Sequence, residues 1–208
     1  MFGKATKTLT IAGLVLAMVA IPACVQAQLN IPDVYQVGYF SNLTQNTPAQ
    51  RVRIINTGQT GVPNIPGLPP QSGDEGVLCA NLYVFDANQH MLACCACPLT
   101  ANAVLDFNVG TDLITNLVTG GPRPTDGAIK LVSSRQTPCD VTNPVPVPDL
   151  RAFGTRVQLG VAALRRLTET EFLPANLRQD ELTYMSNSCT FVQLLGSGQG
   201  VCRCPGVR

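Results

Sequence analysis

Cysteine is the residue type whose number and spacing bear most directly on the chemistry of this chain. Nine cysteines are present, and one of them, Cys24, lies near the N-terminus. The eight that follow residue 27 are Cys79, Cys94, Cys95, Cys97, Cys139, Cys189, Cys202 and Cys204. An even number in an exported chain is typical of a disulfide framework. Metal binding is the alternative, but the sequence lacks the paired C-x2-4-C spacing of zinc sites, and an oxidising compartment consumes thiols. We therefore expect four disulfides, no metal and no other cofactor.

The positions of the cysteines restrict how they pair. Side chains alternate along a strand, so Cys95 and Cys97 should share one face while Cys94 points to the other. The neighbours Cys94 and Cys95 should then have different partners. The last three cysteines form an odd group, so complete pairing requires at least one bond from this group to an earlier cysteine.

Residues 78–98 must position four of these cysteines. Two apolar runs flank a polar turn at 86–90, which predicts a β-hairpin whose strands are buried on both faces. A three-residue loop between Asp86 and His90 would pair residues whose numbers sum to 176, and this register predicts a bond between Cys79 and Cys97. The oxygens of Asp86 and its neighbours suit a turn better than a calcium site.

The other side chains with catalytic potential have ordinary interpretations. His90 is the single histidine and is expected in the exposed turn, and no G-x-S-x-G motif is present. Glu169 and Glu171 share a strand face, where solvated carboxylates are commoner than the paired acids of a glycosidase. Lys130, in an apolar strand, is interpreted as an outer-face lysine rather than a partner in an isopeptide crosslink with an asparagine. We predict no catalytic residue and favour a non-enzymatic protein, with a secreted hydrolase as the third hypothesis.

Residues 1–27 have the pattern of a signal peptide. Lys4 and Lys7 precede an apolar segment at 9–21, and small residues at 25–27 form a cleavage site. The alternative is a lipoprotein anchored through Cys24. No later stretch has the ~20 consecutive apolar residues of a membrane-spanning helix. We expect a secreted, extracellular or periplasmic protein.

Composition favours short strands and turns. After residue 27 the chain has 12 basic and 13 acidic residues, and they form no basic patch. We therefore do not expect nucleic acid as a partner. Only 13% of the residues are charged, whereas 16 are proline and 18 glycine. We predict a mainly β fold, a disulfide-stapled antiparallel β-sandwich of immunoglobulin-like or jelly-roll-like type with one C-terminal helix. The domains would be an N-terminal arm or strand at 28–48 and the sandwich at 49–208.

The pattern of the chain predicts individual elements. Strands are expected at 51–56, 104–109 and 128–134, and a hairpin at 152–159 and 161–167, whose second half has a helical turn as its alternative. A helix at about 177–195 would be capped by Asn176, with Gln179 three residues on. Its apolar stripe, which includes Cys189, would face the sheet; the stripe is Leu182, Met185, Cys189 and Val192.

The N-terminal strand is the main candidate for an interaction. Tyr35, Val37 and Tyr39 alternate on one face, and the strand precedes the cysteine framework. It pairs either within its own sheet or, by strand addition, with the sheet of a neighbouring copy.

Four motifs together resemble a set of uncharacterised secreted bacterial proteins. These are YVFD at 83–86, CCACP at 94–98, TETEF at 168–172 and GSGQGVC at 196–202. The resemblance covers residues 50–204 and implies export and a shared cysteine pattern, without an activity or a ligand.

Two functional hypotheses follow from the sequence. The first is a structural or surface-interaction protein that assembles with itself through the N-terminal strand. The second is a module that binds a cell-surface glycan or protein through the loops at 58–76 and 137–149.

Overall fold

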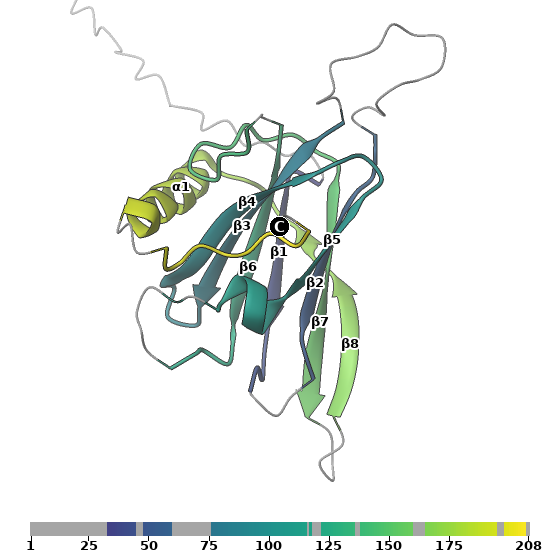
Figure 1. The fold of residues 1–208 in the computed structure, drawn as a ribbon, viewed down its shortest axis with the longest axis vertical. Helices are drawn as coiled ribbons and strands as arrows, with labels where there is room; N and C mark the ends of the chain where they lie inside the picture. The colour runs from purple at the N-terminus through teal and green to yellow at the C-terminus, as the bar shows by residue number, and fades with distance from the viewer. Residues whose placement is uncertain are drawn as a thin grey trace, which may run out of the picture.

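The computed structural model describes residues 33–44, 48–59, 76–115, 117, 122–135, 138–159, 165–194 and 198–206. The predicted signal peptide with Cys24, most of the 58–76 loop and the connection at 160–164 lie outside these residues. Two antiparallel sheets have the strand orders β4-β3-β6-β1-β9 and β5-β2-β7-β8 (Figure 1). The elements are β1 (Tyr35–Phe40), β2 (Arg51–Asn56), β3 (Leu78–Asp86), β4 (Met91–Leu99), β5 (Val104–Asn108), the π-helix η1 (Val109–Leu113), β6 (Gly127–Ser134), β7 (Leu150–Leu159), β8 (Arg165–Glu171), β9 (Leu173–Pro174) and α1 (Gln179–Leu194).

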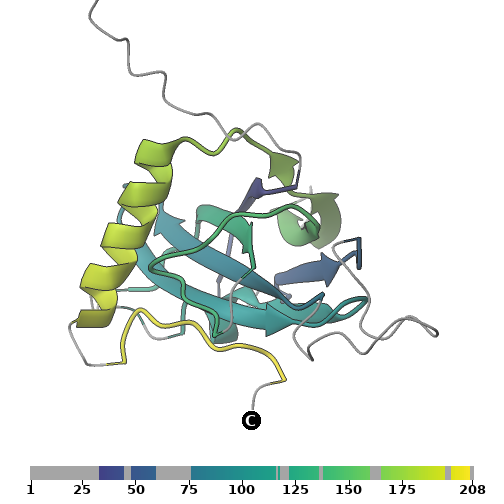
Figure 2. The same ribbon diagram turned by 90° about the horizontal axis from the view of Figure 1, so that it is seen from above.

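The five-stranded sheet is the middle of three layers. One face packs on the four-stranded sheet, and the other carries α1, which lies across it in Figure 2. Leu82 and Phe107 belong to the core between the sheets, while Tyr83 and Met185 belong to a second core under the helix. The predicted mainly β sandwich with one C-terminal helix is therefore confirmed.

This layering explains the continuous apolar runs of the central hairpin. In β3, Leu82 and Val84 face the other sheet, whereas Tyr83 and Phe85 face the helix. All four side chains are buried. A strand between two apolar layers has no solvent-facing positions, so its sequence shows no alternation.

A β-bulge changes the register of this hairpin. The turn forms as predicted, with the Asp86 amide donating to the His90 carbonyl at 3.0 Å and with Phe85 opposite Met91. The register then shifts between Val84 and Phe85, which brings Cys79 opposite Pro98. One residue of shift places Cys79 and Cys97 on opposite faces, so the predicted bond between them is wrong.

Four disulfides join segments far apart in the chain. The pairs are Cys79–Cys139, Cys94–Cys189, Cys95–Cys202 and Cys97–Cys204. The different partners of Cys94 and Cys95, and the bonds from the last three cysteines to the central sheet, confirm the restrictions derived from the sequence. Such a framework fits an extracellular or periplasmic protein.

The C-terminal helix begins later than expected. It starts at Gln179, so Asn176 is not its cap. The preceding residues are held extended, because the Ala175 amide donates to the Tyr35 carbonyl at 2.9 Å and Leu177 is buried. The predicted stripe is correct: its four members are all buried, and Cys189 points inward. Within the described residues, α1 and η1 do not have the length and apolar character of a membrane-spanning helix.

A hairpin forms near the end of the chain as predicted, but its second strand, Arg165–Glu171, continues past the expected end at residue 167. β7 and β8 pair antiparallel from Phe153 opposite Glu171 to Leu159 opposite Arg165. The strand alternative for residues after 160 is therefore correct from Arg165 onward, while the turn itself lies outside the described residues.

Two buried tyrosines make the fold sensitive to alkaline pH. Burial raises the pKa of Tyr35, and the Glu181 carboxylate raises it further; burial likewise raises the pKa of Tyr83. The unfolded chain therefore ionises these groups first, above about pH 10. The contribution of the two tyrosines to the free energy of unfolding should therefore be fully present below about pH 10 and decrease as the pH rises further. We expect tyrosinate absorbance from both residues to appear together with the loss of far-ultraviolet circular dichroism. Full tyrosine ionisation in a chain that is still folded would contradict this.

Candidate functional site

The N-terminal strand β1 occupies a slot in the five-stranded sheet. It pairs with β6 over its whole length, from Tyr35 opposite Val132 to Phe40 opposite Gly127. On its other side lies β9, which pairs only with Gln36 and Val37. The strand that the sequence set apart as an arm is thus an inner strand of the sandwich in this structure, the first of its two predicted alternatives.

The side chains of β1 reach both cores. Phe40 belongs to the core between the sheets, and Tyr35 to the core under α1. Gln36 is buried, and its amide donates to the Leu150 carbonyl while its oxygen accepts from the Ala152 amide at 3.1 Å. A single side chain thereby satisfies two backbone groups of the opposite sheet. Sequence reasoning missed Gln36, because its partners lie more than a hundred residues away.

A small pocket lies beside the exposed end of β1. Its volume is about 50 Å³, and its lining includes Tyr39, Arg156 and Leu173. The Arg156 guanidinium lies 3.8 Å from the centre of the Tyr39 ring and donates a hydrogen bond to Thr170. Tyr39 is 52% exposed and Leu173 is 73% exposed. Because the pocket is small, it suits a single side chain better than a drug-sized ligand.

The floor of this pocket is a tight contact between the sheets. The ring of Phe172 fits against Gly38 of β1, where a Cβ atom would lie 2.3 Å from a ring carbon. A Cβ atom on Gly154, across the sandwich, would lie 3.0 Å from the same ring. A side chain at position 38 would therefore overlap the aromatic ring, whereas one at position 154 would require the ring to shift slightly.

The two edges of the five-stranded sheet differ. At the β4 edge, the segment Gly198–Cys204, which we call the strap, runs parallel to the strand (yellow in Figure 1). The Cys94 amide donates to the Gly200 carbonyl at 2.8 Å. At the other edge the pairing of the two-residue β9 with β1 stops at Val37. No described strand pairs with Tyr39 on that side. Unpaired edges are the positions where a further strand can add.

The turn residues considered as a base or as calcium ligands are engaged with one another. His90 has an exposed side chain, and its ring nitrogen lies 3.2 Å from the Asp86 carboxylate. One Asp86 oxygen accepts from the Asn88 and His90 amides, both at 2.8 Å. Partial burial would raise the pKa of Asp86, but hydrogen bonds from His90 and Asn88 outweigh it and lower the pKa. This geometry is that of an Asx turn closing a hairpin.

The two glutamates on β8 lie on the exposed face of the four-stranded sheet. Glu169 forms an ion pair with Arg53 at 3.0 Å, and Glu171 forms one with Arg151 at 3.0 Å. Arg151 also contacts Asp33 at 3.1 Å. Exposed carboxylates that are paired with arginines have the arrangement of a solvated strand face, rather than of an acid and a nucleophile around a substrate.

Lys130 occupies a different place from the one predicted. It lies on the helix-facing side of β6, where it donates to the Glu181 carboxylate, and only 22% of its side chain is exposed. The Tyr35 hydroxyl donates to the same carboxylate at 3.4 Å, and the lysine nitrogen lies 4.9 Å from the centre of the Phe85 ring. The residue therefore connects α1 to the sheet, and its predicted position on a solvated outer face is corrected.

Comparisons with known proteins do not assign the chain to a family. No protein-family model matches the sequence, and no curated protein matches it. The fold is weakly similar to that of one solved structure, described as the crystal structure of Thermotoga maritima 1070. The TM-score is 0.39 and the sequence identity is 12%, and the match covers 67% of this chain and 92% of the other chain. The function must therefore be argued from the geometry above.

Proposed function

We propose that the chain is a secreted, non-enzymatic structural or surface-interaction protein that assembles with copies of itself by exchange of its N-terminal strand. In such an assembly, β1 of one copy occupies the slot between β6 and β9 of another. The observation that carries the proposal is that β1 fills an inner position of the sheet while no disulfide holds it there.

The covalent framework supports this exchange. The first cysteine among the described residues is Cys79, so all four bonds lie after β1 and β2. Among the described residues β1 is the first strand, and residues 41–50 connect it to β2. It can leave the slot without breaking any of the four disulfides. An identical strand from a neighbour would restore the same hydrogen bonds and core contacts, which is the thermodynamic basis of domain swapping.

The burial of the strand requires the slot to be filled, either by the chain's own β1 or by β1 of a neighbour. An empty slot would expose the side chains that pack on Phe40 and Tyr35, and it would leave the backbone groups bonded by Gln36 without partners. Buried apolar area and satisfied backbone groups both favour a filled slot. The short β9 leaves Tyr39 at an accessible edge, where the incoming strand could first pair.

Non-enzymatic function and export are supported by separate observations. His90 and the two glutamates of β8 are committed to a turn and to ion pairs. The disulfide framework supports export.

Variants with one added cysteine test the exchange directly. Tyr39 and Ala128 face each other in the β1–β6 register. A Tyr39→Cys chain and an Ala128→Cys chain, both residues 28–208, are mixed at increasing concentration and analysed on non-reducing gels. We expect a covalent mixed dimer, accompanied by larger species in light scattering. The matched control replaces Ala128→Cys with Val104→Cys, an exposed residue on β5 that does not pair with β1.

Each outcome decides between the hypotheses. A mixed dimer with Ala128→Cys but not with Val104→Cys supports exchange. Monomers at every concentration, or equal crosslinking in both mixtures, would rule out assembly through β1. The second hypothesis, binding of a surface glycan or protein, would then lead. In the described part of the 137–149 loop, however, Cys139 is bonded to Cys79 and the Val141 carbonyl accepts from the Tyr83 hydroxyl at 2.7 Å.

A further inference from the structure

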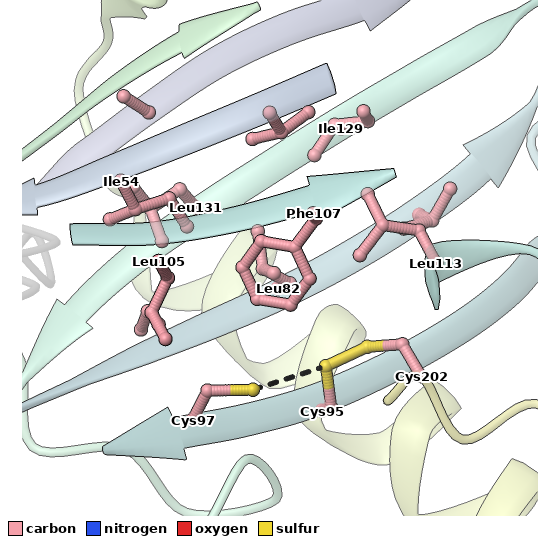
Figure 3. Close-up of a cluster of buried hydrophobic side chains, with 14 of the residues drawn as sticks. Ile54, Leu82, Cys95, Cys97, Leu105, Phe107, Leu113, Ile129, Leu131 and Cys202 are labelled. Carbon is pink, nitrogen blue, oxygen red and sulfur yellow. Dashed lines mark hydrogen bonds between the residues drawn. A yellow bond between two sulfur atoms is a disulfide. The ribbon is translucent and has the colours of Figure 1, made fainter. Parts of the chain in front are cut away.

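Two C-x-C segments lie side by side at the edge of β4. Cys95 and Cys97 are on the strand, and Cys202 and Cys204 are on the strap that runs parallel to it. The bonds Cys95–Cys202 and Cys97–Cys204 join the segments directly across. We call these four residues the clasp. Figure 3 shows the sulfur atoms of Cys95 and Cys97 pointing toward each other beneath Leu82 and Phe107.

The sulfur atoms of the clasp are as close together as the ligands of one metal ion. The Cys95 and Cys97 sulfurs are 3.9 Å apart, although they belong to different disulfides. Together with the Cys204 sulfur they lie within 4.8 Å of one another. In a tetrahedral tetrathiolate with metal–sulfur bonds of about 2.3 Å, neighbouring sulfurs are separated by about 3.8 Å. The distance between the Cys95 and Cys97 sulfurs already matches this separation. Reduction of the two disulfides would let the bonded sulfur pairs, Cys95–Cys202 and Cys97–Cys204, move apart toward the same separation.

The surroundings of the clasp suit a soft metal ion. Cys95 and Cys202 are each 5% exposed and Cys97 is fully buried, so water is largely excluded. Cys204 is partly exposed and provides a path of entry. Cys95 and Cys97 present their side chains to one face of β4, and Cys202 and Cys204 lie opposite them, so all four thiols can converge without a change of fold.

We propose that the clasp, once reduced, binds a single thiophilic divalent cation of the zinc and cadmium type through Cys95, Cys97, Cys202 and Cys204. Each disulfide accepts two electrons and two protons from one equivalent of reductant. A dithiol reductant is oxidised to a disulfide, and a phosphine takes an oxygen atom from water and becomes a phosphine oxide. The four thiols release four protons as they bind the cation, and a tetrathiolate of net charge −2 results. The metal then replaces the two covalent bonds that hold the strap on β4.

The experiment uses the chain of residues 28–208 reduced with a phosphine, and Cd²⁺ alone as the probe. We expect one Cd²⁺ per chain by native mass spectrometry, a thiolate-to-metal absorption band, and a higher melting temperature than that of the reduced chain without metal. Alkylation followed by peptide mapping locates the ion. Cys95, Cys97, Cys202 and Cys204 should be protected, while the other four cysteines react.

A matched variant and the oxidised chain complete the test. Cys97→Ala/Cys204→Ala removes half of the ligands, and protection of Cys95 and Cys202 should be lost. The oxidised chain should bind no Cd²⁺. Equal alkylation of all eight cysteines in the presence of Cd²⁺ would overturn the proposal. A reduced chain that remains unfolded with Cd²⁺ would overturn it as well, because the site depends on the pairing of the strap with β4. The proposal is independent of strand exchange.

Discussion

The Cys79→Ala/Cys139→Ala variant is expected to lose about 4 kcal/mol of the free energy of unfolding, more than the loss of either Cys94–Cys189 or Cys97–Cys204. Sequence separation alone gives the opposite order, since Cys79 and Cys139 are 60 residues apart, and the other two pairs 95 and 107. The stabilisation from a crosslink depends on the ring that it closes in the unfolded chain. The relevant ring is therefore the smallest one that the bond closes. Its size is the length of the shortest covalent path between the two cysteines through the backbone and the other three disulfides.

That path differs greatly among the bonds. Cys79–Cys139 closes a ring of ~60 residues that no other bond shortens. With Cys95–Cys202 intact, Cys94–Cys189 closes a ring of only ~15 residues, which corresponds to about 3 kcal/mol. Cys97–Cys204 closes a ring of ~6 residues beside the same bond, for about 2 kcal/mol.

Denaturant unfolding followed by circular dichroism measures this order. The three double-alanine variants are compared in one buffer, after mass spectrometry has confirmed that each retains the other three bonds. Alanine is preferred to serine because Cys79, Cys94 and Cys189 are fully buried and a hydroxyl would lack a partner there. An order that follows sequence separation would contradict the path argument.

The Gly38→Ala variant is expected to lose about 2 kcal/mol or more, because the added methyl group overlaps the ring of Phe172. Phe172 is buried in the core between the two sheets, so its ring has little room to move aside. Gly154→Ala should cost less, since its Cβ atom would be at 3.0 Å rather than 2.3 Å. Gly110→Ala is the matched control, because the nearest atom to its Cβ would be at 3.6 Å, an ordinary contact.

A double-mutant cycle assigns the effect to the aromatic ring. Phe172→Ala alone should cost ~3–5 kcal/mol, as is usual for a buried phenylalanine. In that background Gly38→Ala should cost almost nothing, which gives a coupling energy of about 2 kcal/mol between the two positions. Thermal or denaturant unfolding of the four proteins provides the values. Additive losses would show that Gly38 is required for a reason other than contact with Phe172.

Features that depend on neighbouring residues were predictable from the sequence. The polar residues between Asp86 and His90 define a turn whatever the rest of the fold does. The helical spacing of Met185 and Cys189 identified the buried face of α1. The faces of Cys94 and Cys95 followed from the alternation of a strand, and their separate partners followed from those faces.

Features that depend on distant contacts were not predictable. The bulge between Val84 and Phe85 arises within a strand whose local sequence is uniformly apolar, and it alone overturned the predicted Cys79 pairing. The start of α1 depends on a backbone bond from Ala175 to Tyr35. In the candidate site, the strand itself was expected, but its inner position and the role of Gln36 depend on strands β6 and β7.

The disulfide pattern also determines when the fold can be completed. A chain that emerges N-terminus first presents Cys79, Cys94, Cys95 and Cys97 to oxidants before any of their native partners has appeared. Three of the four native bonds span 95 or 107 residues, so they must wait for the last part of the chain. Early oxidation would pair cysteines within the hairpin. Maturation should therefore depend on reshuffling by a disulfide isomerase, and its rate should be set by that exchange rather than by formation of the sheets.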